Sequence, residues 1–144
     1  MFFHFLEGFS TLHFPVFVVL ILGLLNLLDE RFKGDEIVVA GGTDSAVVPY
    51  PPLWVIYHFV TRDTISGGVL GADQKITRKE ALQVETINNA YLTFEERVKG
   101  SIEPGKLADL VVLPEDTLTV AERHIEQMHV SMTMVGGAVV YRRP

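Results

Sequence analysis

The sequence predicts an α/β fold, from one strand, two helix starts and a hairpin. The β-branched run 37–40 ends in two glycines, which is typical of a strand buried on both faces of a parallel sheet. Two segments, 77–80 and 119–122, have the Thr-x-x-Glu pattern of a capping box and predict the start of a helix. Near the C-terminus, a Gly-Gly pair joins two apolar runs and predicts a β-hairpin.

Length and composition exclude several classes of protein. The chain has 144 residues, 12 of them Lys or Arg and 18 Asp or Glu, and no cysteine. It is too short for a closed eight-stranded α/β barrel, which takes ~250 residues. The lack of cysteine excludes a disulfide scaffold, a thiolate zinc site and a cysteine nucleophile. The acidic balance indicates no nucleic-acid partner.

Residues 1–34 form an apolar N-terminal segment with three open interpretations. Glu7 is the only charged residue in 1–28, and the run 9–28 approaches the ~20 apolar residues that span a bilayer. No basic region or small-residue cleavage site marks a secretory signal. The segment is a membrane anchor, a buried helix of a larger fold, or sequence that does not belong to the working protein.

The predicted helices follow the first strand. Pro51-Pro52 opens a helix over 53–62, because proline is tolerated in the first helical turn. A glycine-rich loop then occupies 64–73. The first capping box predicts a helix from Thr77 to about Phe94, and the second predicts a helix from Thr119 to about Met128.

The C-terminal part is predicted to be mostly β. The run 107–113 is expected to form a strand, with a turn at 114–116. The hairpin pairs 130–135 with 138–141 through Gly136-Gly137.

Asp44 is the candidate site residue. It follows the strand 37–40 and Gly41-Gly42, so it would lie at the carboxyl end of a parallel sheet, where α/β active sites form. The alternative, that Asp44 caps the following turn, stays open from local pattern alone.

The other chemistry-bearing residues give no motif. None of the histidines forms a His-x-His or His-Glu-x-x-His pair, and His58 is expected to be a packed or half-exposed residue of its helix. Ser45 lacks the Gly-x-Ser-x-Gly context of a hydrolase nucleophile.

Several stretches, taken together, resemble the C-terminal region of the amidohydrolase superfamily of metal-dependent hydrolases, and its family 3 in particular. They keep the family's order, from the end of the last barrel strand to a closing hairpin. They are Gly42–Ser45, Trp54–Tyr57, Val60–Arg62, Thr77–Tyr91, the signature GSIEPGKLADLVVL at Gly100–Leu113, and Val130–Tyr141.

The resemblance implies a divided fold. Residues 35–98 would be the end of a TIM barrel, with its last strand and helices, and 99–144 would be strands of a small accessory β-sandwich. Residues 1–34 have no counterpart and are expected to be a transmembrane helix or an artefact of the gene model. A truncated gene, a mispredicted start and a degenerate copy all remain open.

The resemblance also implies a function. The family hydrolyses non-peptide carbon–nitrogen bonds of small amides or cyclic amides with a metal-activated water, and its metal is divalent, zinc in the first place. Only Asp44 is carried over, as a metal ligand or as the group that accepts the proton from the water. The family's His-x-His is absent, so this chain alone is expected to be incomplete, inactive and without its metal.

The remaining expectations concern cellular location, substrate and self-association. The chain is expected to be cytoplasmic, with a small-molecule amide as the family's substrate. Unpaired strand edges at 37–40 are expected to make it self-associate. The alternative is a membrane-tethered remnant or interaction module that uses 9–28 and does not catalyse.

Overall fold

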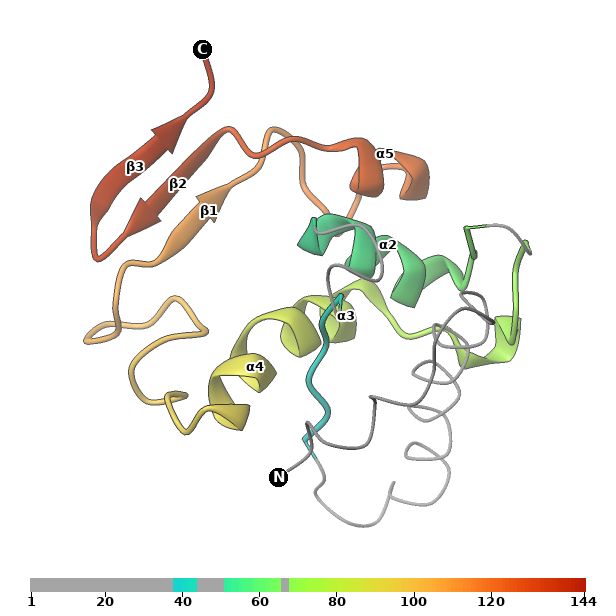
Figure 1. Cartoon of the computed structure of the whole chain (residues 1–144), viewed down its shortest axis with the longest axis horizontal. Coiled ribbons are helices and arrows are strands. Elements are labelled where there is room, and N and C mark those ends of the chain that lie inside the picture. The colour runs from blue at the N-terminus through green and yellow to red at the C-terminus, as the bar shows by residue number, and fades with distance from the viewer. Residues whose placement is uncertain (1–37, 44–50, 66–67) are drawn as a thin grey trace, which may run out of the picture.

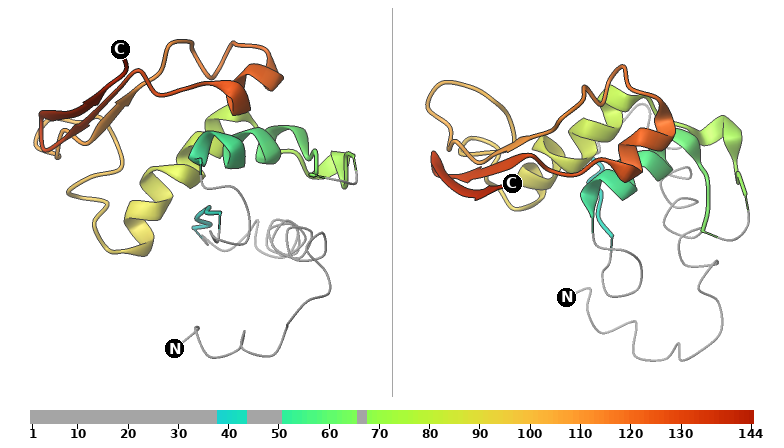
Figure 2. Two further views of the ribbon diagram at one scale, coloured as in Figure 1. Left: turned by 45° about the horizontal axis from the view of Figure 1, so that its top comes forward. Right: turned by 90° about the horizontal axis from the view of Figure 1, so that it is seen from above.

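The computed structural model describes residues 38–43, 51–65 and 68–144. Its helices gather around α2 (Pro52–Thr61), and a three-stranded sheet lies to one side of them (Figures 1 and 2). α2 packs against both α3 (Arg78–Glu85) and α5 (Glu122–Gln127). Segments far apart in the sequence therefore share one small α/β structure.

α2 confirms the first predicted helix. Pro52 occupies its first turn, and the helix ends at Arg62, whose φ of 60° lies in the left-handed region. The residues from Val55 to Arg62 are all buried, so the helix is enclosed on every side. Its apolar side chains form the core with Ala81 and Ile125, both fully buried.

The first capping box is present at the start of α3. The Thr77 hydroxyl accepts a hydrogen bond from the Glu80 N–H at 3.2 Å, and the Glu80 carboxylate accepts one from the Thr77 N–H at 2.7 Å. Two of the N–H groups that have no partner inside the helix are satisfied in this way.

The prediction of one continuous helix to Phe94 is wrong. α3 ends at Glu85 and α4 (Ile87–Leu92) begins after Thr86, whose φ of −125° and ψ of −90° are not helical. The Thr86 hydroxyl donates to the Leu82 carbonyl at 2.6 Å, while its N–H donates to the carbonyl of Gln83. A side chain that competes for backbone carbonyls in this way bends a helix. We call this break the α3–α4 elbow.

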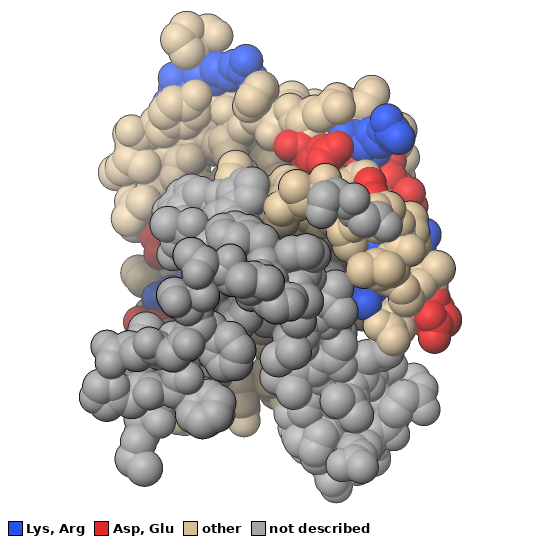
Figure 3. All heavy atoms as spheres, turned by 45° about the vertical axis from the view of Figure 1, so that its right-hand side comes forward, with Lys and Arg blue, Asp and Glu red and all other residues tan. Residues whose placement is uncertain are grey.

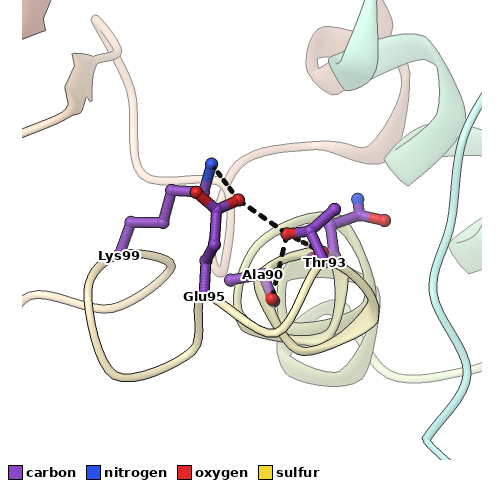
Figure 4. Close-up of polar contacts among 5 residues, drawn as sticks. Ala90, Thr93, Glu95 and Lys99 are labelled. Atoms are coloured by element: carbon purple, nitrogen blue, oxygen red, sulfur yellow. Dashed lines mark hydrogen bonds and ion pairs between the residues drawn. The ribbon is translucent and has the colours of Figure 1, made fainter.

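Side chains close the end of α4 (Figure 4). The Thr93 hydroxyl lies 3.1 Å from the Ala90 carbonyl and 2.8 Å from a carboxylate oxygen of Glu95. The Lys99 ammonium lies 2.7 Å from the same oxygen, and its hydrogen bond lowers the pKa of Glu95. A left-handed Phe94, with φ of 59°, follows the helix. These contacts explain why α4 stops here.

The second predicted capping box does not form. α5 begins at Glu122 with Ala121 as its N-cap, and no side chain caps it. The Thr119 hydroxyl instead lies 3.2 Å from the Asp116 carboxylate. The Asp116 carboxylate also accepts a hydrogen bond from the Leu118 N–H. The Thr119 hydroxyl therefore belongs to a local turn and does not cap α5.

The sheet consists of β1 (Leu110–Val112), β2 (Met132–Val135) and β3 (Ala138–Arg142), paired antiparallel in that order. It confirms the predicted hairpin. Gly136 and Gly137 have φ of 55° and 83°, which the tight turn requires and which glycine adopts without a steric cost. The Gly136 N–H also donates to the Asp109 carboxylate at 2.7 Å.

The strand predicted at 37–40 is not observed in the residues described there. Residues 38–43 belong to no strand, and Val38 is 39% exposed instead of buried on both faces. A parallel strand needs neighbours, and the described sheet is separate and antiparallel. The helices of 51–65 and 68–144 include none long and apolar enough to cross a membrane. The apolar segment 1–34 lies outside the described residues.

Candidate functional site

The candidate site is approached through residues 38–43, which lead towards Asp44. Asp44 itself lies outside the described residues, and Thr43 is the last one before it. The segment lies beside α3 (Figure 1). The structure therefore shows how the backbone that precedes Asp44 is held in place.

Two hydrogen bonds attach this segment to the α3–α4 elbow. The Asn88 side-chain amide donates to the Val39 carbonyl at 2.7 Å, and the Gly41 N–H donates to the Val84 carbonyl at 3.2 Å. Both are backbone groups of the segment that would otherwise need strand partners.

Gly41 makes a close approach to α3. A Cβ at this position would collide with the Glu85 carboxylate and lie 2.7 Å from Cγ1 of Val84 and 3.0 Å from the Phe59 ring. A larger residue at this position would therefore require these neighbouring side chains to move. The predicted role of this glycine as a strand end is thus replaced by one of close packing.

Glu85 is an unusual acid at this contact. It is half-buried, and burial raises its pKa from 4.5 to about 7. Its Oε1 atom has no hydrogen-bond partner among the residues that the structure describes. A carboxyl group of this kind changes protonation near neutral pH, which is one property of functional sites.

A second polar group lies at the end of α2. His58 is buried, its Nδ1–H donates to the Asp63 carbonyl at 2.5 Å, and its Nε2 has no partner within the described ranges. The Tyr57 hydroxyl donates to the Asp63 carboxylate at 2.9 Å, and burial raises the pKa of Tyr57. Trp54 covers the imidazole edge-on at a centroid distance of 3.9 Å. The prediction that His58 packs on its helix is confirmed.

The described residues do not form a metal site. Nowhere in 38–43, 51–65 or 68–144 do three or more His, Asp or Glu side chains gather as ligands. His58 has its orphan nitrogen inside the helical core, while His124 is exposed and lies 3.7 Å from Glu115. A catalytic zinc takes three protein ligands, so these residues do not fit one by themselves.

The charged side chains on the face in Figure 3 lie in a few separate groups. Among the described atoms, most of the Lys and Arg groups there lie near Asp or Glu side chains. This agrees with the acidic net charge of −6.

A match over most of the chain decides the family. Residues 31–141 match the model of the amidohydrolase family. The chain belongs to this family. The recognition made from the signature at 100–113 and from the flanking stretches is therefore confirmed.

Individual relatives of this amidohydrolase chain are hydrolases by name. It is 34% identical over 105 residues to an N-substituted formamide deformylase of Arthrobacter pascens, covering 73% of this chain and 19% of that protein. It is 26% identical to the putative amidohydrolase YtcJ of Bacillus subtilis, covering 74% of this chain and 21% of the relative. An imidazolonepropionase of Porphyromonas gingivalis is 41% identical over 66 residues, covering 46% of this chain and 16% of that protein.

A solved structure has the same fold. The crystal structure of an amidohydrolase from Thermotoga maritima matches with a TM-score of 0.58 and 24% identity, covering 79% of this chain and 25% of that one. This amidohydrolase chain thus spans between 16% and 25% of the length of these relatives. Its α/β character, predicted from local patterns, agrees with that neighbour.

The structure brings together residues that the sequence patterns did not single out for the site. Asn88 and Glu85 were expected only as members of a helix, yet they contact the segment that leads to Asp44. One signal was available, because Glu85 is an acid between the core positions Ala81 and Ala90. The break at Thr86, between these two residues, has no such signal.

Proposed function

We propose that this chain forms the C-terminal part of an enzyme that hydrolyses non-peptide carbon–nitrogen bonds in small amides or cyclic amides. The observation that carries the proposal is the 34% identity, over 105 residues, to a protein named for the deformylation of N-substituted formamides. The imidazolonepropionase match supports a cyclic amide as the alternative substrate class. A substituted formamide is the first substrate to test.

In this proposal, residues 35–98 end a TIM barrel and 99–144 contribute strands to an accessory β-sandwich. The match to the Thermotoga maritima amidohydrolase covers a quarter of that chain, which supports a partial barrel. The antiparallel sheet of β1, β2 and β3 is the proposed sandwich portion. The 38–43 segment would then become a barrel strand only beside neighbouring strands.

Asp44 is the proposed site carboxylate, as a ligand of the divalent metal or as a proton acceptor. The family supports a divalent metal, with zinc as the first choice. The described residues include no cluster of possible metal ligands. We therefore expect most of the ligands to come from other parts of the whole enzyme. The 144-residue chain is therefore expected to bind zinc substoichiometrically, as elemental analysis of the purified protein would measure; one tightly bound zinc per chain would contradict this.

The enzyme is proposed to be cytoplasmic, and this chain on its own is proposed to self-associate. Exposed apolar side chains on the sheet, such as Val111, Val139 and Val140, support self-association of the chain on its own. Sedimentation velocity is expected to find species larger than the 16.1 kDa monomer. A single monomeric species would contradict self-association.

A chimera tests the proposed activity. Residues 35–144 replace the matching C-terminal part of the Arthrobacter deformylase, and circular dichroism establishes that the product is folded. The proposal predicts hydrolysis of an N-substituted formamide by the folded chimera. A folded chimera with no hydrolysis above that of the deformylase lacking this part would contradict it.

A further inference from the structure

At the α3–α4 elbow, a backbone carbonyl that a continuous helix would use internally is free to bind another segment. In an unbroken helix, the Val84 carbonyl would accept the N–H of residue 88. Here the break at Thr86 leaves that carbonyl to the Gly41 N–H, at 3.2 Å. The Val84 carbonyl thus accepts a hydrogen bond from a segment more than forty residues away in the sequence.

Beside the same break, a side-chain amide of α4 donates a hydrogen bond to the segment 38–43. Asn88 lies in the first turn of α4, and its Nδ2 donates to the Val39 carbonyl at 2.7 Å. The two bonds hold alternate residues of the segment, Val39 and Gly41. A pair spaced by two residues fixes register, because a shift by one residue would exchange both groups for those pointing the other way.

Close packing adds a third restraint. At Gly41 the segment approaches α2 and α3 so closely that a Cβ would have to displace the side chains of Val84, Glu85 and Phe59. Thr43, two residues further on, is the last described residue before Asp44. These contacts hold residues 39–41, and the proposed site residue follows three positions later in the sequence.

We propose that Asn88 is a positioning residue: with the freed carbonyl of Val84, its amide sets the register and direction of the segment that delivers Asp44. The part concerning Asp44 rests on the proposed function. The attachment of 39–41 by Asn88 does not, and it can be tested separately.

Hydrogen exchange in the full chain tests the attachment. In Asn88→Asp, the carboxylate cannot donate to the Val39 carbonyl, and exchange of the Gly41 amide is expected to rise about 3- to 10-fold, the worth of one hydrogen bond. Asn88→Gln keeps a donor and is expected to restore most of the protection. The matched control is Asn89→Asp, on the same helical turn, which is expected to leave Gly41 unchanged.

Two results would overturn the attachment. One is unchanged Gly41 exchange in Asn88→Asp. The other is faster exchange of equal size in α2 and the sheet, which would assign Asn88 a general role in stability.

A kinetic measurement tests the link to the site. In the active chimera, Asn88→Asp is expected to lower kcat about 10-fold or more and leave KM within about 2-fold, because misplacing a reacting group mainly slows the chemical step. An unchanged kcat would overturn positioning of Asp44. If the chimera carrying native Asn88 shows no hydrolysis, the proposed function fails, while the exchange result still decides the attachment.

Discussion

At the scale of single residues, Glu85 shows how burial changes an ordinary acid. Nothing in its side-chain type distinguishes it from the other glutamates of the chain. Its packing against Gly41 removes water from the carboxyl group, and this raises its pKa to about 7. The folded chain therefore binds a proton at Glu85, between pH 4.5 and about 7, that the unfolded chain releases.

This linkage predicts a pH-dependent stability. Since the folded state binds more protons in that window, the free energy of unfolding falls as pH rises from 4.5 to about 7 and is then level with respect to this group. Glu85→Gln is expected to remove the decline and to be more stable at pH 8 by about 1–2 kcal/mol, after allowance for the partial exposure of the carboxyl group. Urea unfolding at pH 5 and pH 8 measures both effects.

The control for this prediction is Glu122→Gln, which removes an exposed glutamate in the first turn of α5. It is expected to keep the decline with pH. An identical pH dependence in Glu85→Gln and the native chain would show that Glu85 is not the group responsible.

At the scale of elements, the two Thr-x-x-Glu patterns separate what sequence can and cannot predict. The pattern at Thr77 forms its box, whereas the one at Thr119 loses its hydroxyl to Asp116, which lies three residues earlier. Local motifs predicted α2, the start of α3 and the β2–β3 hairpin because each depends on neighbouring residues. The conformation of segment 38–43 depends on contacts with residues distant in sequence. The elbow at Thr86 interrupts a helical run that contains no glycine or proline. Local patterns could therefore predict neither.

The same two threonines make a matched pair of variants. Thr77→Ala removes a formed cap and is expected to lower the free energy of unfolding by about 1 kcal/mol. Thr119→Ala removes only an exposed contact and is expected to change it by less than about 0.5 kcal/mol. Equal losses in chemical denaturation of the two variants would contradict the assignment of the caps.

At the scale of the whole molecule, one side chain joins the helices to the C-terminal part. The Arg78 guanidinium, in the first turn of α3, donates to the carbonyls of Thr117 (3.1 Å) and Val120 (2.5 Å). This is the stretch of chain between the sheet strand β1 and the helix α5. The family could be predicted because its signature at 100–113 is continuous in sequence. A metal-ligand set could not, because none of the histidines stands at the spacing of a ligand pair.

We propose that this chain supplies the C-terminal part of a working amidohydrolase, with Asp44 as its site carboxylate. The most direct measurement is kcat/KM for an N-substituted formamide in the deformylase chimera, with and without Asp44→Asn. Asp73→Asn, at an exposed aspartate of the 3₁₀ turn Ala72–Gln74, is the matched control. Asp44→Asn is expected to lower kcat/KM by about 100-fold or more, and Asp73→Asn is expected to change it little. Full activity in folded Asp44→Asn would contradict the proposed role of Asp44.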